Sequence, residues 1–135
     1  MQQVVDCDTQ AYGCEGGWTY VAYEYIEKAG GYETFQDYPY TARDGKCDFD
    51  KTKAVAKISS WKYVTQNKDE AVMKNYIATT GPLSICVDAA SWQFYNKGVI
   101  KSCGKQIDHC VQLVGYGTVD GVEAWLVRNS WGAAW

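Results

Sequence analysis

Six cysteines in a chain of 135 residues are the feature that most limits how this sequence can fold. The number is even and high for a protein of a reducing compartment, so we expect disulfides and an oxidising environment. Six cysteines allow many pairings, and their spacing alone selects none of them. Residues 1–6 lack the basic start and apolar stretch of a secretory signal, so we expect that a signal was removed or that the chain is one piece of a longer protein.

Composition narrows the classes of function. The 13 basic and 16 acidic residues give a net charge of −3, which argues against the basic face that nucleic-acid binding needs. No apolar run approaches the roughly 20 residues of a membrane-spanning helix. One histidine and scattered cysteines do not make a zinc site, and no glycine-rich stretch ends in the Lys-Ser/Thr of a phosphate loop. We therefore expect no nucleic-acid partner, no membrane span, no metal and no cofactor.

The order of the expected elements is helices first and strands later, which is an α+β layout. Apolar residues at helical spacing predict helices over residues 18–29 and 70–78, the second capped by Asn67 or Asp69. Elsewhere the patterns predict a turn-rich segment over residues 4–17, strands over residues 54–64, 83–87, 107–114 and 124–128, and one helical turn at residues 91–95. A change in character near residues 60–65 divides the chain into residues 1–62 and 63–135.

The single histidine, His109, is the strongest candidate for chemistry. It lies within an expected strand, and Asn129 directly follows another. If these strands pair, the Asn129 amide can accept a hydrogen bond from one ring N–H and fix the tautomer of His109 without adding charge. A neutral partner suits a cysteine nucleophile, whose resting state is a thiolate–imidazolium pair. The alternative is that a lone histidine is structural or exposed, as such residues more often are.

Seven short motifs, in order and at compatible spacing, resemble the later part of a papain-like (cathepsin-like) cysteine protease. They are Val5-Asp6-Cys7-Asp8, Gly13-Cys14-Glu15-Gly16-Gly17, Tyr38-Pro39-Tyr40, Gly81-Pro82-Leu83-Ser84, residues 104–109, Gly115-Tyr116-Gly117 and Asn129-Ser130-Trp131-Gly132. The resemblance runs from end to end of the chain. It implies a papain-like α+β fold, with residues 1–62 as an incomplete helical half and residues 63–135 as most of the β-barrel half.

The resemblance also implies roles for individual residues. His109 would be the catalytic imidazole, Asn129 the residue that orients it, and Trp131 the indole that shields their hydrogen bond from water. The implied substrate-binding residues are Gly16, Gly17, Cys86, Ile107, Asp108, Cys110 and Trp131. Gly16 and Gly17 would line the cleft, while Cys86, Ile107 and Cys110 would line an apolar pocket for the second substrate side chain. Asp108 would tune the electrostatics of the cleft, unless it is a solvated residue at a strand edge.

The cysteines divide into three groups under this resemblance. Cys7 and Cys47 match a disulfide of the family. Cys14 and Cys103 match cysteines whose partners lie outside this sequence, so we expect both to be unpaired. Cys86 and Cys110 are not standard cysteines of the family, and we hypothesise that they bridge; the alternative is two buried free thiols that act as small apolar residues.

We expect the sequence to depart from the family at both ends, because the nucleophilic cysteine of such proteases lies upstream of the segment represented here and their closing strands lie beyond Trp135. We therefore expect a thiol peptidase acting on peptide or protein substrates, in a lysosome or outside the cell, of which this chain alone is inactive. A further chain could cover the apolar face that the missing central helix would leave on residues 18–29. The alternatives are a non-catalytic, protease-like module within an assembly, or one chain of a two-chain enzyme.

Overall fold

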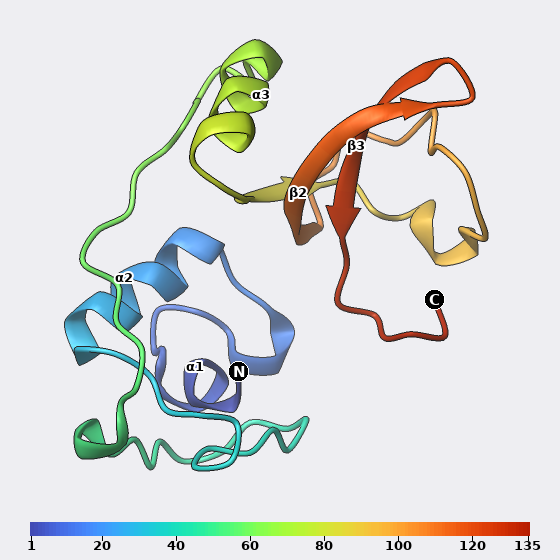
Figure 1. Ribbon diagram of the computed structural model, residues 1–135. Coiled ribbons are helices and arrows are strands. Elements are labelled where there is room, and N and C mark those ends of the chain that lie inside the picture. The colour runs from blue at the N-terminus through green and yellow to red at the C-terminus, as the bar shows by residue number, and fades with distance from the viewer. The chain divides into compact units, whose positions relative to one another are not determined.

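The computed structural model describes residues 1–135, which divide into two compact units, Met1–Lys62 and Tyr63–Trp135. The first unit contains helices α1 and α2, and the second contains helix α3 and a three-stranded antiparallel sheet (Figure 1). This order of helices before strands confirms the α+β fold class predicted from the sequence. None of the helices is both long enough and apolar enough to cross a membrane.

Helix α2, Thr19–Ala29, is the main element of the first unit and lies where the apolar spacing predicts it. It ends at Gly30, which adopts a left-handed conformation with φ of 86°. Glycine favours this position because it has no Cβ to oppose a positive φ. The N–H groups of Gly30 and Gly31 both bond to the carbonyl of Ile26, at 3.1 and 3.0 Å, and so satisfy the end of the helix.

Helix α1, Gln2–Cys7, corrects the prediction that the start of the chain is only turn-rich. Six residues are too few for a helix that is stable by local interactions alone. The helix is instead held by tertiary contacts, because the side chains of Gln2 and Gln3 are almost completely buried and hydrogen-bonded. Only the folded surroundings reveal this, since two adjacent glutamines look like surface residues in the sequence.

Residues 54–64 were predicted as a strand, and this prediction is wrong. The segment contributes only one isolated bridge, between Ala56 and Tyr32, which belongs to no sheet. Its loose alternation of apolar residues therefore has no neighbouring strands to join, and Val55 remains 66% exposed. A strand needs partners to satisfy its backbone groups, and none lies beside this segment beyond that bridge.

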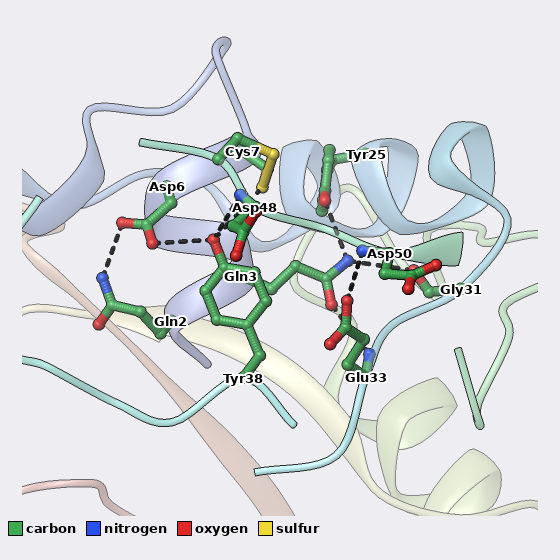
Figure 2. Close-up of a disulfide and its surroundings, with 11 residues drawn as sticks. Gln2, Gln3, Asp6, Cys7, Tyr25, Gly31, Glu33, Tyr38, Asp48 and Asp50 are labelled. Atoms are coloured by element: carbon green, nitrogen blue, oxygen red, sulfur yellow. Dashed lines mark hydrogen bonds between the residues drawn. A yellow bond between two sulfur atoms is a disulfide. The ribbon is translucent and has the colours of Figure 1, made fainter. Parts of the chain in front are cut away.

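The loops of the first unit are fixed by a disulfide and by buried polar side chains. Cys7 and Cys47 form a disulfide across a sequence separation of 40 residues, with a Cα–Cα distance of 4.7 Å. Beside it, the Tyr38 hydroxyl donates to Asp6 Oδ2 at 3.0 Å and accepts the backbone N–H of Asp48 at 3.1 Å (Figure 2). The end of helix α1 is thereby joined to the long loop by covalent and polar bonds together.

Gln3 makes a second polar centre in the same unit. Its Nε2 donates to the Tyr25 hydroxyl at 3.0 Å and to the Gly31 carbonyl at 3.3 Å, and its Oε1 accepts the Glu33 N–H at 2.9 Å (Figure 2). Glu33 in turn accepts the backbone N–H of Asp50 at 2.6 Å. One amide side chain therefore ties helix α2, the turn that follows it and the loop beyond to helix α1.

In the second unit, helix α3 spans Glu70–Thr79 and is capped by Asp69. The Asp69 carboxylate accepts the backbone N–H groups of Ala71 and Val72, which have no partner within the helix. The three strands follow as β1 (Leu83–Val87), β2 (His109–Val119) and β3 (Val122–Arg128). One short 3₁₀ helix, Trp92–Phe94, lies in the long connection between β1 and β2.

The sheet is antiparallel with strand order β1-β2-β3, and β2 lies in its centre (Figure 1). Asp120 and Gly121 join β2 to β3, with φ values of 51° and 77°. Two consecutive positive φ angles are the requirement of the tight two-residue hairpin for which Asp-Gly is favoured. The core lies on one face of the sheet, where Ala89, Trp92 and Val111 are buried together.

Candidate active site

His109 is the first residue of strand β2 and lies opposite Val87 of strand β1. Side chains alternate along a strand, so His109 shares a face with Val111 and Leu113, both of which are buried. The imidazole therefore lies at the border of the apolar core, at the end of the strand, and is half-buried. Cys110, its neighbour, points to the opposite face.

Asn129 directly follows strand β3 and is hydrogen-bonded to the imidazole. Because Arg128 of β3 pairs with Gln112 of β2, Asn129 lies diagonally opposite His109, within reach of its ring. Its Oδ1 is 2.8 Å from Nε2 of His109 and also accepts the Ser130 N–H at 2.7 Å.

The chemical nature of these atoms sets the tautomer of the ring. An amide oxygen only accepts hydrogen bonds, so the ring proton must be on Nε2 of His109. In the neutral ring Nδ1 then carries the lone pair, and Nδ1 is the atom that can take and return a proton. The hydrogen bond to Asn129 thus leaves Nδ1 as the ring nitrogen of His109 that is free to exchange a proton.

A series of aromatic rings extends from His109 to the end of the chain. Trp131 stacks on His109 with ring centroids 5.0 Å apart and an interplanar angle of 26°. Trp135 meets Trp131 edge-on at 5.3 Å, and its indole N–H donates to the Trp92 carbonyl at 2.8 Å. The aromatic rings join the end of the chain to the core of the unit, and Trp131 lies over one face of the imidazole.

Trp135 was not singled out from the sequence. It follows no strand or helix, so no periodic pattern marks it, and only its indole type hinted at a packing role.

Two aspartates close the loop that precedes His109. The Asp108 carboxylate accepts the backbone N–H of Ala89 at 2.8 Å, and the Asp88 carboxylate accepts that of Gln106 at 2.9 Å. A Cβ at Gly104 would overlap the Asp88 carboxylate, so the close contact between the backbone of residue 104 and this carboxylate favours glycine. Asp108, which we predicted as a substrate-binding residue, is exposed. Its carboxylate holds the backbone of Ala89 beside His109.

Sequence reasoning missed Asp88, although one signal was available. An aspartate directly after a strand often bonds to nearby backbone N–H groups, and Asp88 follows strand β1. It is nearly fully buried and also accepts the Ala90 N–H at 3.3 Å.

Cys86 and Cys110 form a disulfide in the structure. They lie directly opposite each other on β1 and β2, with a Cα–Cα distance of 3.9 Å. Ile107, two residues before His109, is 42% exposed.

The remaining predicted site residues belong to the first unit. Gly16 and Gly17 follow the 3₁₀ helix Gly13–Glu15, and both are exposed. The structure therefore brings His109, Asn129 and Trp131 together within the second unit. Cys14 and Cys103, expected to be unpaired, are exposed free cysteines.

No group of three or more His, Cys, Asp or Glu side chains is arranged to hold a metal ion. Two surface hollows of about 380 and 310 Å³ lie elsewhere, and neither is lined by His109 or Asn129. The first lies between helix α3 and the β2–β3 hairpin, around Lys74, Tyr116 and Trp125. Neither hollow therefore belongs to the site formed by His109, Asn129 and Trp131.

Comparison with known proteins gives a consistent result. All of residues 1–135 match the family model described as papain family cysteine protease. The chain is 45% identical to the KDEL-tailed cysteine endopeptidase CEP2 of Arabidopsis thaliana and 37% identical to cathepsin K of Mus musculus. These alignments cover 99% of this chain but 38% and 42% of the two relatives, so the chain spans about two fifths of their length.

Solved structures agree with these sequence relatives. The structure of the digestive procathepsin L2 proteinase from the larval midgut of Tenebrio molitor matches with a TM-score of 0.93 and 38% sequence identity. That alignment covers 99% of this chain and 44% of the solved chain. Procathepsin L 3 from the same tissue matches with a TM-score of 0.91 at 32% identity.

Proposed function

Because this chain belongs to the papain family of cysteine proteases, we propose that it carries the general acid–base pair of a cysteine-type endopeptidase. The observation that carries the proposal is the 2.8 Å hydrogen bond between His109 Nε2 and Asn129 Oδ1. A binding module would need neither an oriented imidazole nor an amide that fixes its tautomer. The substrate class is an extended peptide or protein chain.

The roles follow from the atoms. In the resting state Nδ1 of His109 holds a proton taken from a cysteine thiol, which leaves a thiolate. The thiolate attacks the scissile carbonyl carbon, and Nδ1 gives its proton to the departing amine as the peptide C–N bond breaks. Nδ1 then takes a proton from water, whose oxygen attacks the thioester and releases the acid, and the thiolate is restored. Asn129 accepts from Nε2 throughout and so keeps Nδ1 directed at the reaction.

We propose further that these 135 residues do not hydrolyse peptides alone, because none of their cysteines fits the role of nucleophile. Four are in disulfides, and Cys103, the free thiol of the second unit, is exposed and makes no hydrogen bond to the ring of His109. Desolvation and the nearby Asp44 carboxylate raise the pKa of the Cys14 thiol, whereas a nucleophile needs a lowered one. The nucleophile would therefore come from polypeptide outside these residues.

The location of the whole protein is part of the same proposal. Two disulfides support a lysosomal or extracellular location, because such bonds rarely persist in the cytosol. The additional polypeptide that supplies the thiol would also cover apolar surface on helix α2.

The test compares the chain alone with the chain completed. The purified chain is incubated with a dipeptidyl fluorogenic substrate and a thiol reductant, and we expect no turnover that a thiol-specific inhibitor blocks. Joining the chain to the upstream region of Tenebrio procathepsin L2 is expected to produce inhibitor-sensitive turnover. In that chimera His109→Ala is expected to lower kcat/KM by about 10²–10⁴-fold, the usual contribution of a general acid–base group.

Asn129→Ala is the second variant, and Asn96→Ala, an exposed residue outside the site, is its matched control. Asn129→Ala should lower kcat more than it raises KM, while Asn96→Ala should change neither. Thiol-dependent turnover by the isolated chain contradicts the proposed inactivity. A folded chimera that is indifferent to His109→Ala contradicts the proposed catalytic role and favours a non-catalytic module.

A further inference from the structure

The disulfide between Cys86 and Cys110 joins the residue pair next to the one that contains His109. Cys86 pairs with Cys110, and the next and last pair of the β1–β2 ladder is Val87 with His109. Beyond that pair lies the connecting loop of residues 88–108, whose two ends are joined by hydrogen bonds and by no further covalent bond. The disulfide is therefore the last covalent tie before the end of the ladder where His109 lies.

The alternation of side chains along the strand separates the disulfide from the imidazole of His109. Because side chains alternate, the two sulfurs lie on the face of the sheet opposite the imidazole. Cys110 follows His109 directly, so its Cα position fixes the backbone from which the His109 ring projects. The disulfide therefore acts on the ring through the backbone and takes no part in proton transfer.

Apart from the disulfide, strand β1 is held at this end by non-covalent contacts alone, such as the hydrogen bond from the Asp108 N–H to the Val87 carbonyl at 3.0 Å and that from the Ala89 N–H to the Asp108 carboxylate at 2.8 Å. The strand has five residues and lies at the edge of the sheet, so it is paired on one side only. Terminal pairs of such a ladder open more easily than central ones. The backbone of His109 must nevertheless be held closely, since the bond to Asn129 comes from the other side of β2 and is 2.8 Å long.

We propose that the Cys86–Cys110 disulfide is a positioning element for His109, which keeps its ring on Asn129 and is released by dithiol reductants. In the reduction, a thiolate of the dithiol attacks one sulfur and forms a mixed disulfide, and its second thiol then displaces that sulfur. The protein gains two electrons and two protons as two thiols, and the dithiol becomes a cyclic disulfide. The effect on the ring is independent of catalysis, but its consequence for activity depends on the proposed function.

The uniqueness of His109 makes a direct measurement possible, because every histidine ring signal comes from this residue. The chain is labelled with ¹⁵N in the histidine ring, in a Cys14→Ser/Cys103→Ser background that removes the free thiols. We expect the oxidised protein to show one tautomer, protonated at Nε2. In Cys86→Val/Cys110→Ala the ratio of the two neutral tautomers should fall about fivefold, the factor by which one neutral hydrogen bond usually biases an equilibrium.

Two reference variants make the result specific. Asn129→Ala removes the hydrogen bond itself and gives the limiting spectrum. Cys7→Ala/Cys47→Ala removes the other disulfide, which lies in the first unit, and should leave the histidine ring signals unchanged. An unchanged ring spectrum in a folded Cys86→Val/Cys110→Ala protein overturns the proposal, because a purely stabilising crosslink would not alter the tautomer of the folded state.

A time course covers the case in which the disulfide-free variant does not fold. The Cys14→Ser/Cys103→Ser protein is reduced with dithiothreitol while ring nitrogen and backbone amide signals are followed together. Loss of the single-tautomer pattern before the amide signals collapse supports the proposal, and return of the pattern on reoxidation strengthens it. Simultaneous loss of both kinds of signal overturns it. None of these readouts uses turnover, so failure here is distinct from failure of the proposed function.

Discussion

The two units differ in the kind of side chain that each buries in its interior. Buried side chains of the first unit are mostly polar, namely Gln2, Gln3, Asp8 and Glu33, together with Ile26 and Tyr38. Buried side chains of the second unit are mostly apolar, namely Ala89, Trp92, Val111 and Leu113, together with Asp88. The first unit has short helices and long loops, while the second has a sheet whose backbone groups satisfy one another.

This difference shows how the loops of the first unit and the imidazole of the second unit are held in place. Long loops leave backbone N–H and C=O groups without partners, so buried amide and carboxylate side chains must supply them. A sheet already pairs its backbone, so its free face can bury apolar side chains and support an imidazole at the edge. The second unit therefore carries the oriented His109, while the first depends on exact hydrogen bonding for its shape.

The largest expected effect concerns the disulfide of the first unit. Cys7→Ala/Cys47→Ala should lower the free energy of unfolding of that unit by about 4 kcal/mol, since the bond closes a sequence separation of 40 residues. Native-state hydrogen exchange reads each unit separately: protection in helices α1 and α2 should fall, while protection in strands β1–β3 should persist. Equal loss of protection in both units would show that the two units unfold as one.

The corresponding test of the second unit removes apolar volume. Leu113, in the central strand β2, is completely buried, and Leu113→Ala should destabilise that unit by about 3 kcal/mol through lost burial and the cavity that remains. Hydrogen exchange should now show loss of protection in the strands and none in helix α2. Leu126→Ala is the matched control, because Leu126 is 63% exposed and should change little.

A smaller effect tests whether polar bonds carry the first unit. Gln3→Leu keeps the approximate volume but leaves the Glu33 N–H and the Gly31 carbonyl without partners, which should cost roughly 2 kcal/mol. Gln10→Leu, at an exposed position, is the control and should lie within about 0.5 kcal/mol of the original chain. A neutral result for Gln3→Leu in urea unfolding would mean that shape, and not hydrogen bonding, determines the packing of α1.

The sequence predicts the regular elements well where local signals are complete. Helix α3 has an aspartate cap and an apolar stripe, helix α2 ends at a glycine, and both are confirmed within about a residue. The predictions for helix α1 and for residues 54–64 are both wrong: a helix was missed in the first segment, and a strand was predicted but is absent in the second. The reason is the same, because the conformation of both segments is decided by partners distant in the sequence. Local patterns cannot report such partners.

The candidate site follows the same division. The contact between His109 and Asn129 could be predicted, because both residues lie at the ends of strands that are evident in the sequence. The membership in the papain family, inferred from seven short motifs, is confirmed. The loop contacts of Asp88 and the stacking of Trp135 could not be derived, because they depend on how an irregular segment folds back on the sheet.

The smallest expected effect is confined to alkaline pH and distinguishes the two units by their tyrosines. Burial raises the pKa of Tyr38, and the nearby Asp6 carboxylate adds to the shift; burial likewise raises the pKa of Tyr25. The folded state then holds these protons more tightly than the unfolded chain, so the stabilisation is complete below about pH 10 and is lost as the pH rises through the folded values. Urea midpoints measured from pH 8 upward, in the absence of free thiols, should fall for the first unit. Tyr38→Phe should flatten that fall, whereas Tyr116→Phe in the second unit should not; an equal slope in all three proteins would remove this difference between the units.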